Sequence, residues 1–378
     1  MNRRIAAIQP SATLAVTARA NALVAEGKDV VRFTAGEPDM PTPAHICAAA
    51  KEAIDAGKHK YTPTEGVPAL RKAIADKLLR EGKLAYKEDE VIATAGGKQA
   101  IMEALLALCE ESDEVLIPSP YWVSYPEQTR LAGAKPVIVP TENGVARAAL
   151  IKERLTPRSK VIIISSPSNP TGAVIPKEEL KRIAALAREN GLWVISDEVY
   201  EHLVFEGEHA SVASFLHDRT IVIGSCSKTY AMTGWRIGWA AGPKEVIRAM
   251  ATIQSHMTSG PSSIAQYAAI AALEGPQECV KELRDAFAKR RRLLCKLLDD
   301  AGLPYLEPHG AFYVFVDISK TGLTSGQFME TLLEERLVAV IPGKPFGSDS
   351  HVRLSYACSE DTIKKGMARI KAFMEGYA

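Results

Sequence analysis

Three polar residues, Asn169, Asp197 and Lys228, each follow a short run of apolar, β-forming residues. The runs that precede them are residues 161–165, 192–196 and 220–224. In doubly wound sheets, ligands bind just outside the carboxyl ends of the strands, so we expect these three side chains to meet at one site. A lysine there could act as a nucleophile or a base, because both roles need an amine whose pKa is lowered by its surroundings.

The elements that must position these residues alternate between strands and helices. Residues 97–242 have the pattern of an open, mostly parallel sheet with helices on both faces. Residues 176–190 predict a crossover helix, because a proline starts the segment, apolar residues recur at helical spacing and Gly191 stops it. Two further strands are expected at residues 115–118 and 136–139, and a further helix at residues 100–109.

The pattern changes after residue 262. Long helices are expected at residues 263–274 and 278–302, and the second has no glycine or proline before its last residue. Residues 311–317 and 351–356 then alternate as half-buried strands do. These segments predict a smaller α+β domain at the C-terminus.

Composition narrows the class of protein. The chain has 378 residues, of which 47% are hydrophobic and 24% charged, which is typical of a soluble globular protein with one large and one smaller domain. The formal net charge is +1, and the basic run at residues 289–292 is interpreted as the solvated face of a helix, so nucleic acid is not an expected partner. No stretch approaches the ~20 apolar residues that span a bilayer. No membrane association and a cytoplasmic location are therefore expected.

Several common cofactor sites lack their motifs. The sequence has no G-x-G-x-x-G after a strand and no G-x-x-x-x-G-K-[ST], so ordinary dinucleotide and nucleotide sites are not indicated. Its six cysteines form no C-x-x-C pair, and most are expected to be buried free thiols. The eight histidines include no H-E-x-x-H, and no metal site is expected.

Four ordered motifs resemble those of the class I aminotransferases of pyridoxal 5'-phosphate (PLP) fold type I. They are Gly36–Asp39, Ser168–Gly172, Ser196–Tyr200, and Ser225–Thr229 with Gly234–Gly238 downstream. The resemblance covers nearly the whole chain and is closest to the bacterial aspartate aminotransferase branch. It implies an α/β fold with a mostly parallel, seven-stranded sheet in a large PLP-binding domain, residues 46–280. It also implies a small α+β domain, residues 281–378, and an N-terminal arm that forms part of the small domain, residues 1–45.

The same resemblance assigns the cofactor ring to four residues. Lys228 would carry PLP as a Schiff base and would later act as the base that moves a proton from the substrate Cα. Asp197 would pair with the pyridinium nitrogen, while Tyr200 and Asn169 would donate hydrogen bonds to the phenolic oxygen O3'. The simpler alternatives are that Asp197 only caps a strand and that Asn169 only builds a turn.

The cofactor phosphate needs backbone N–H groups at a helix start together with cations and hydroxyls. By resemblance, the backbone of Gly97 and Lys98, the Ser225 hydroxyl and the Arg236 guanidinium would bind it. Tyr61 would reach the phosphate of a neighbouring subunit, which implies a homodimer with composite sites. Alternatively, Tyr61 is a core or loop aromatic.

The substrate would be held by a further set of residues. Trp122 would stack on the pyridine face, unless it is a plain core tryptophan. Arg353 would grip the α-carboxylate through its planar fork, and Gly36 would let substrate approach the backbone. Lys98 and Thr13 would bind a second carboxylate, because the stretch at residues 258–263 has no arginine for it. Alternatively, Lys98 only neutralises phosphate.

These expectations predict an aminotransferase that moves the amino group of an acidic amino acid, most simply L-aspartate, to 2-oxoglutarate. Aromatic amino acids, alanine and prephenate remain alternative substrates. Relatives that accept prephenate tend to carry a lysine where this chain has Gln9. Another fold type I enzyme, such as a carbon–sulfur lyase or a decarboxylating relative, is the alternative reaction class. A PLP-sensing transcription regulator would need a DNA-binding module for which the N-terminal length leaves no room.

Overall fold

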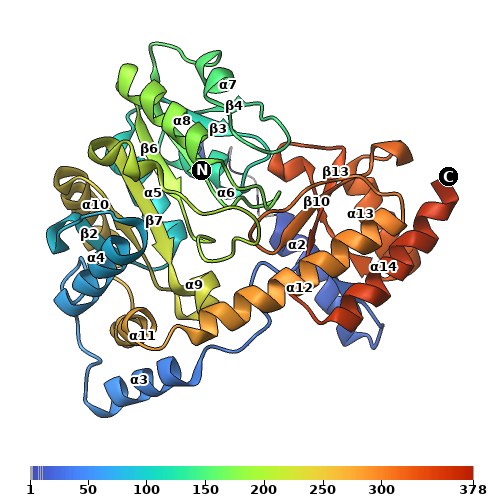
Figure 1. Ribbon diagram of the computed structural model, residues 1–378, viewed down its shortest axis with the longest axis horizontal. Coiled ribbons are helices and arrows are strands. Elements are labelled where there is room, and N and C mark those ends of the chain that lie inside the picture. The colour runs from blue at the N-terminus through green and yellow to red at the C-terminus, as the bar shows by residue number, and fades with distance from the viewer. Residues whose placement is uncertain (1–2, 7, 9, 11, 378) are drawn as a thin grey trace.

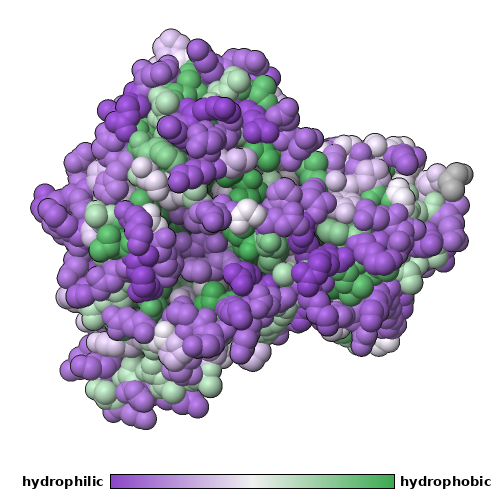
Figure 2. Space-filling view, viewed as in Figure 1, coloured by the Kyte–Doolittle hydropathy of each residue, from purple (hydrophilic) through white to green (hydrophobic). Residues whose placement is uncertain are grey.

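The fold is that of a computed structural model, which describes residues 3–6, 8, 10 and 12–377. Two lobes are visible, a larger one built around a central sheet and a smaller one that contains the C-terminus (Figure 1). Helix α12 (Glu278–Asp300) runs unbroken from the larger lobe to the smaller one. In space-filling form, hydrophilic residues cover most of the face in view (Figure 2).

The large lobe contains a seven-stranded sheet in the order β2-β8-β7-β6-β5-β3-β4. Its strands are β2 (Val91–Thr94), β3 (Glu114–Pro118), β4 (Lys135–Val139), β5 (Ser159–Ser165), β6 (Trp193–Asp197), β7 (Thr220–Ser225) and β8 (Gly238–Ala241). Every pairing is parallel except those of β8, which runs antiparallel to β7 and β2. The prediction of a mostly parallel seven-stranded sheet is therefore confirmed, and the five expected strands lie within two residues of their predicted bounds.

Helices cover both faces of this sheet, as the continuous apolar strands predict. Along β5, Val161 and Ile163 pack in one core cluster with helices α5 and α10. Ile162 and Ile164 face the other way and pack with α8. Alternation of side chains along a strand thus builds two cores from one run of residues. The helices of this lobe are α3 (Ala44–Asp55), α4 (Pro68–Gly82), α5 (Gly97–Leu108), α6 (Ser124–Leu131), α7 (Ala148–Lys152), α8 (Lys177–Glu189), α9 (Cys226–Thr229), α10 (Lys244–Met257) and α11 (Ser263–Glu274).

The small lobe is built around an antiparallel sheet in the order β12-β13-β10-β9, together with a parallel pair, β1 and β11. These strands are β1 (Val31–Arg32), β9 (Tyr305–Leu306), β10 (Tyr313–Asp317), β11 (Val338–Ala339), β12 (Ile341–Pro342) and β13 (His351–Ser355). The remaining helices are α1 (Arg3–Ala6), α2 (Ala12–Ala25), α13 (Ser325–Arg336) and α14 (Glu360–Met374). The predicted α+β character of this part of the chain is confirmed.

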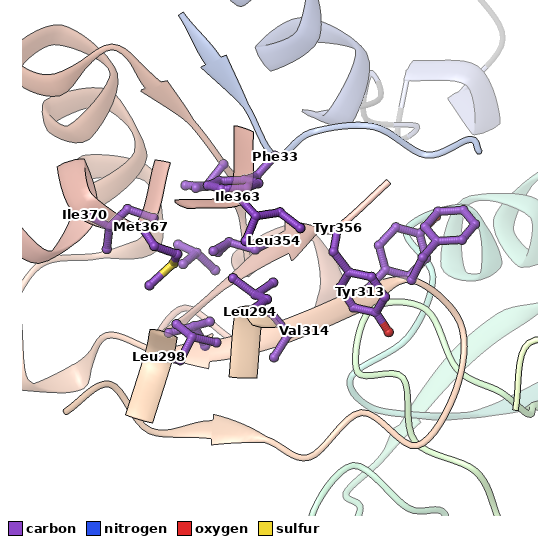
Figure 3. Packing of buried hydrophobic residues seen from close by; sticks show 14 of the residues in the cluster. Phe33, Leu294, Leu298, Tyr313, Val314, Leu354, Tyr356, Ile363, Met367 and Ile370 are labelled. Carbon is purple, nitrogen blue, oxygen red and sulfur yellow. The ribbon is translucent and has the colours of Figure 1, made fainter. Parts of the chain in front are cut away.

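The N-terminal segment packs into the small lobe. Phe33, just after β1, lies against Ile363 of α14 in a shared core that also holds Met367 and Ile370 (Figure 3). Residues far apart in sequence therefore form one hydrophobic core, as expected if the N-terminal arm belongs partly to the small domain. The domain boundaries at residues 45 and 280 stay a prediction.

The interpretation of residues 289–292 as a solvated face is wrong for two of the four. Lys289 is exposed, but the side chains of Arg290 and Arg291 are only 14% and 8% exposed. Arg291 lies between Glu206 and Glu307, and Arg290 pairs with Asp39. Their partners come from distant parts of the chain, so the local pattern could not reveal them.

All six cysteines are free, but only three are buried; Cys47, Cys279 and Cys358 are partly exposed, so the expectation that most are buried is met by half of them. Among the helices of the described residues, none combines the length and the apolar character needed to cross a membrane.

Candidate active site

A cavity of about 450 Å³ opens at the carboxyl ends of β5, β6 and β7, where Ser165, Asp197 and Ser225 line it. Residues of the small lobe, including Tyr313 and Arg353, complete its wall. Of the residues singled out in the sequence, the cavity brings together all except Tyr61: Thr13, Gly36, Gly97, Lys98, Trp122, Asn169, Asp197, Tyr200, Ser225, Lys228, Arg236 and Arg353. Asn169, Asp197 and Lys228 thus lie together at the carboxyl ends of these strands.

The charge of the cavity favours anions. Among the described residues, the lining includes four cationic side chains, Lys98, Lys228, Arg236 and Arg353. It includes two carboxylates, Glu37 and Asp197. Four positive charges against two negative ones leave an excess that anionic ligands can neutralise.

Lys228 is the third residue of the single-turn helix α9, and its amine points into the cavity. Its Nζ donates a hydrogen bond of 2.5 Å to the backbone oxygen of Gly36. Burial lowers the pKa of Lys228 to about 8; the charge of Glu37 acts in the opposite direction, while Arg353 adds to the lowering. A buried amine with this pKa is neutral in a substantial fraction of molecules near pH 8, as a nucleophile or base requires.

Asp197 ends strand β6 and is buried. The Tyr125 hydroxyl donates a 2.6 Å hydrogen bond to its Oδ2, and the Val199 amide donates to Oδ1 at 3.3 Å. Burial raises the pKa of Asp197 to about 6, even though the hydrogen bond from Tyr125 acts to lower it. A buried carboxylate in this position would be stabilised by a positively charged N–H group placed against it.

Arg353 is a fully buried cation on β13, with 3% of its surface exposed. Its guanidinium donates to Asn169 Oδ1 at 3.0 Å and to the Thr34 carbonyl at 3.2 Å, and it lies over the Tyr313 ring. Within the described part of the chain it has no carboxylate partner, and its Nε has no hydrogen-bond acceptor. Burial lowers the pKa of Arg353. A carboxylate from a ligand would supply the missing countercharge.

Two tyrosines lie beside this arginine. Tyr200 and Tyr313 share a hydrogen bond of 2.9 Å between their hydroxyls. Burial raises the pKa of Tyr200 well above its ordinary value, so the phenol stays protonated and can donate. Tyr200 thus lies in one network with the Asn169–Arg353 pair.

Helix α5 points its N-terminus at the cavity. It begins at Gly97, earlier than the predicted residue 100, and follows Gly96, whose φ of +84° suits a residue without Cβ. A Cβ at Gly96 would lie 2.5 Å from Arg236 Nη2, so the guanidinium packs directly on this turn. Exposed N–H groups at a helix start, next to an arginine, make a natural phosphate site.

Ser225 lines the same cavity, and its hydroxyl also caps α9 by accepting from the Ser227 amide at 3.0 Å.

Lys98 lies beside Trp122 at the cavity wall. Its ammonium sits 4.9 Å from the centre of the Trp122 ring, and burial, together with the nearby Arg236, lowers its pKa. Thr13 from α2 lines the cavity with them, whereas Gln9 lies outside the described residues. Lys98 is thus placed where its ammonium can reach either a cofactor phosphate or a substrate carboxylate.

Gly36 and Tyr61 differ from the other expected residues. A Cβ at Gly36 would meet only the Tyr313 hydroxyl, at 3.9 Å, so the chain itself does not require glycine there. Any requirement would come from a bound ligand. Tyr61 does not line the cavity of its own chain and is 99% exposed. That exposure speaks against a core role for Tyr61.

Sequence reasoning missed two tyrosines of this site. Tyr125 and Tyr313 bond to partners 72 and 113 residues away, which no local pattern shows. The only available signal for Tyr125 was its place three residues after Trp122, in the run Pro120–Pro126. Tyr313 is the third residue of the strand predicted at residues 311–317 and carries no motif of its own.

The described residues fit PLP. The amine of Lys228 can bond to an aldehyde, and the buried Asp197 carboxylate can hold a protonated ring nitrogen. The N-terminus of α5 with Arg236 can hold a phosphate, and Arg353, which has no carboxylate partner among the described residues, can hold a substrate carboxylate.

Comparisons with known proteins identify the family. The profile of aminotransferase class I and II matches residues 28–370. The chain is 46% identical to an aspartate aminotransferase of Geobacillus stearothermophilus, over 100% of this chain and 99% of that protein. It is also 46% identical to an aspartate/prephenate aminotransferase of Thermus thermophilus, over 98% and 97% of the two chains. A solved structure of aspartate aminotransferase from Thermus thermophilus with maleate has a TM-score of 0.96 and 45% identity, covering 98% of this chain and 99% of that one. This chain belongs to the class I and II aminotransferases and is a PLP-dependent enzyme of fold type I.

Proposed function

We propose that the enzyme transfers the amino group of L-aspartate to 2-oxoglutarate, giving oxaloacetate and L-glutamate. The observation that carries the proposal is the pair of cations, Arg353 and Lys98, in one cavity. Arg353 is buried with no carboxylate partner among the described residues, and Lys98 contributes a second cation to the lining of the same cavity. Aspartate, glutamate and their oxo acids each carry two carboxylates, one for each cation.

Each reacting group of the substrate then has a residue to hold it. Arg353 binds the α-carboxylate with two parallel hydrogen bonds, and Asn169 holds the guanidinium in place at 3.0 Å. Lys98, with Thr13 nearby in the lining, binds the distal carboxylate. Gly36 leaves room for the substrate beside the backbone.

PLP, when bound, supplies a ring that accepts the electron pair left behind when a proton leaves the substrate Cα. Lys228 removes that proton and returns it, which its pKa of about 8 allows at neutral to mildly alkaline pH. Asp197 keeps the ring nitrogen protonated, Tyr200 and Asn169 bind O3', and Trp122 stacks on the ring. Gly97, Lys98, Ser225 and Arg236 bind the phosphate.

The relatives support an acidic substrate. Two of those named above are described as aspartate or aspartate/prephenate aminotransferases, and the solved structure contains maleate, a four-carbon dicarboxylate. The name of the Thermus relative also keeps prephenate in view as an amino acceptor. Aromatic amino acids and alanine remain the alternative donors. If Lys98 only neutralised the cofactor phosphate, neutral donors would react as well as acidic ones.

The experiment is a panel of amino donors with 2-oxoglutarate, ranked by kcat/KM from glutamate formation. We expect aspartate to exceed alanine and phenylalanine. Transamination itself separates this proposal from a lyase, which would release ammonia or a thiol without forming glutamate from 2-oxoglutarate. A neutral donor at the top of the ranking would contradict the substrate assignment.

Lys98 can be tested separately with Lys98→Met, which keeps the stem over Trp122 and removes the charge. A charge-assisted hydrogen bond is worth about 1.5 to 3 kcal/mol, so kcat/KM for aspartate should fall about 10- to 150-fold. The values for alanine and phenylalanine should hardly change. Equal losses for all donors would show that Lys98 serves the cofactor and does not select the substrate.

We also propose a cytoplasmic homodimer in which Tyr61 of each chain completes the phosphate site of the other. In the single chain Tyr61 is almost fully exposed and Met257 is 54% exposed. Both exposures support this assembly. Large apolar side chains left in solvent on one chain are expected where a partner covers them.

A further inference from the structure

A network of charged side chains with a buried lysine at its centre lies outside the cavity, next to the turn that carries Lys228. At its centre is Lys77 of α4, which is 1% exposed. Its Nζ lies 2.5 Å from Glu201 Oε1 and 3.3 Å from Glu81 Oε2. Burial acts to lower the pKa of Lys77, but the charges of Glu201 and Glu81 outweigh it, and the pKa is raised. Lys77 is therefore an ammonium that neutralises these carboxylates.

His202 extends this network to the Lys228 turn. Its Nε2 lies 3.0 Å from Glu81 Oε2, and its Nδ1 lies 3.2 Å from Thr229 Oγ1. Burial acts to raise the pKa of Glu81, but the hydrogen bond from His202 and the charge of Lys77 lower it to about 2. The ionised Glu81 can only accept, so Nε2 carries a proton and donates to it. Nδ1 shares the second hydrogen bond of the ring with the Thr229 hydroxyl.

The position of Thr229 gives this bond its importance. Thr229 directly follows Lys228 and is the last residue of α9, which has only four residues. A helix of one turn is not stable by itself, so its geometry depends on contacts with the rest of the protein. Ser225 caps the first end by accepting from the Ser227 amide, and beyond the last end Tyr230 bonds to Gln277 at 2.8 Å. His202 is the contact at Thr229 itself.

His202 also belongs to the segment that carries two other site residues. It lies two residues after Tyr200 and five after Asp197. Its neighbour Glu201 is fixed to the buried Lys77, so the backbone on which His202 stands is anchored to α4. One side chain thus connects the Lys228 turn to the Asp197–Tyr200 segment.

We propose that His202 is a positioning residue for Lys228. Its hydrogen bond to Thr229 fixes the end of the α9 turn, and thereby the direction of the Lys228 amine relative to Asp197 and Tyr200. The inference rests on the role given to Lys228 in the proposed function. His202 does not touch substrate or cofactor in this account, because it acts through Thr229.

The arrangement of carboxylate, imidazole and hydroxyl resembles the triad of a hydrolase. However, Thr229 is 3% exposed and, unlike Ser227 and Lys228 before it, does not line the cavity. A nucleophile must reach its substrate. The geometry therefore favours positioning over a second catalytic centre.

The test uses substitutions that separate the two bonds of the imidazole ring. The side-chain amide of asparagine can occupy the place of Nδ1 and, through its oxygen or its nitrogen, pair with the Thr229 hydroxyl; the amide nitrogen of glutamine can occupy the place of Nε2 and donate to Glu81. His202→Asn should therefore keep a hydrogen bond to Thr229, whereas His202→Gln should keep only the one to Glu81. Thr229→Val removes the hydroxyl at nearly constant volume, and Thr229→Ser retains it.

Two measurements report on Lys228. The first is the rate at which cofactor-free protein recaptures PLP, followed by visible absorbance, and the second is kcat and KM for the amino donor in the holoenzyme. A neutral hydrogen bond corresponds to a factor of about 2 to 12 in an equilibrium constant. We expect PLP capture and kcat to fall by about that factor in Thr229→Val and His202→Gln, with KM unchanged because Arg353 and Lys98 are untouched. His202→Asn and Thr229→Ser should stay near wild type.

Combining Thr229→Val with His202→Gln should cause no further loss, because both remove the same bond. Thr220→Val is the matched control. It removes a buried hydroxyl that donates to Leu216 at 2.6 Å, at the far end of β7. It should lower the melting temperature but leave PLP capture and kcat unchanged.

Equal losses in His202→Asn and His202→Gln would overturn the inference, as would normal PLP capture in a folded Thr229→Val variant. If Thr229→Val does not fold, the two histidine variants still decide, because both keep the threonine. Failure of the proposed function would look different. The wild type itself would then bind PLP, but borohydride would not fix the cofactor to a lysine. That result would also remove the basis of this inference.

Discussion

For single residues, the chemistry centres on Lys228, an amine in the wall of the cavity whose pKa of about 8 results mainly from burial. In the cofactor-free protein, the rate of reaction with PLP should therefore rise with pH and level off above about 8. An exposed lysine would continue to gain reactivity up to its ordinary pKa near 10.4. A pH–rate profile of PLP capture measures this directly. A midpoint near the ordinary value would show that the amine is solvated.

The same pKa predicts a stability effect with a definite sign. The pKa of Lys228 is lower in the folded chain than in the unfolded chain, so between about pH 8 and pH 10.5 the unfolded chain binds more protons. The contribution of this group to stability thus rises with pH across that window. Lys228→Met removes the rise and should stabilise the cofactor-free protein near pH 8, by at most about 3 kcal/mol. Urea unfolding of both proteins at pH 8 and pH 10 checks the difference.

Tyr125 provides a second residue-scale prediction. Its hydroxyl lowers the pKa of Asp197, which burial raises to about 6. Tyr125→Phe should raise that pKa further, so the acidic limb of the kcat/KM profile should move to higher pH. A charge-assisted bond of about 1.5 to 3 kcal/mol corresponds to a shift of about 1 to 2 pH units. Tyr121→Phe, in the same run but away from Asp197, is the control. An unmoved acidic limb in Tyr125→Phe would contradict the role of this hydroxyl.

Among the elements, helix α12 is attached to the loop that contains Gly36 and Asp39 by an ion pair with two hydrogen bonds. Arg290 Nη1 and Nη2 lie 2.6 and 3.0 Å from the two carboxylate oxygens of Asp39, three residues after Gly36. Asp39→Asn should raise KM for the amino donor several-fold, because the Gly36 loop loses its fixed place. The swapped pair Arg290→Asp with Asp39→Arg should recover part of the loss. Lys289→Met, on the exposed neighbour, should have no effect in the same steady-state assay.

The elements also show what a sequence can predict and what it cannot. Strands β5, β6 and β7 were predictable because buried parallel strands are continuous runs of β-branched residues. Strands β2 and β8 were not, because Val91–Thr94 and Gly238–Ala241 are short, and their antiparallel pairing is a tertiary contact. Likewise, the ends of strands indicated Asn169, Asp197 and Lys228. The roles of those residues came from family resemblance, and Tyr125 and Tyr313 only from the folded chain.

At the scale of the whole molecule, the proposed dimer predicts complementation between two inactive variants. Lys228→Ala removes the cofactor lysine, and Tyr61→Ala removes the side chain proposed to cross to the partner. In a mixed dimer, one site contains both lesions and the other contains neither, so activity should rise towards a quarter of the wild-type value after subunit exchange at equal ratio. A mixture of differently tagged Lys228→Ala chains is the control. Proven exchange without recovery would count against shared sites.

The bond between PLP and Lys228 is best checked by borohydride reduction of the holoenzyme followed by peptide mass mapping. We expect one reduced PLP adduct per chain, located on the peptide that contains Lys228, and no adduct in Lys228→Ala. An adduct on another lysine, or a holoenzyme in which borohydride fixes no cofactor to the chain, would contradict this expectation.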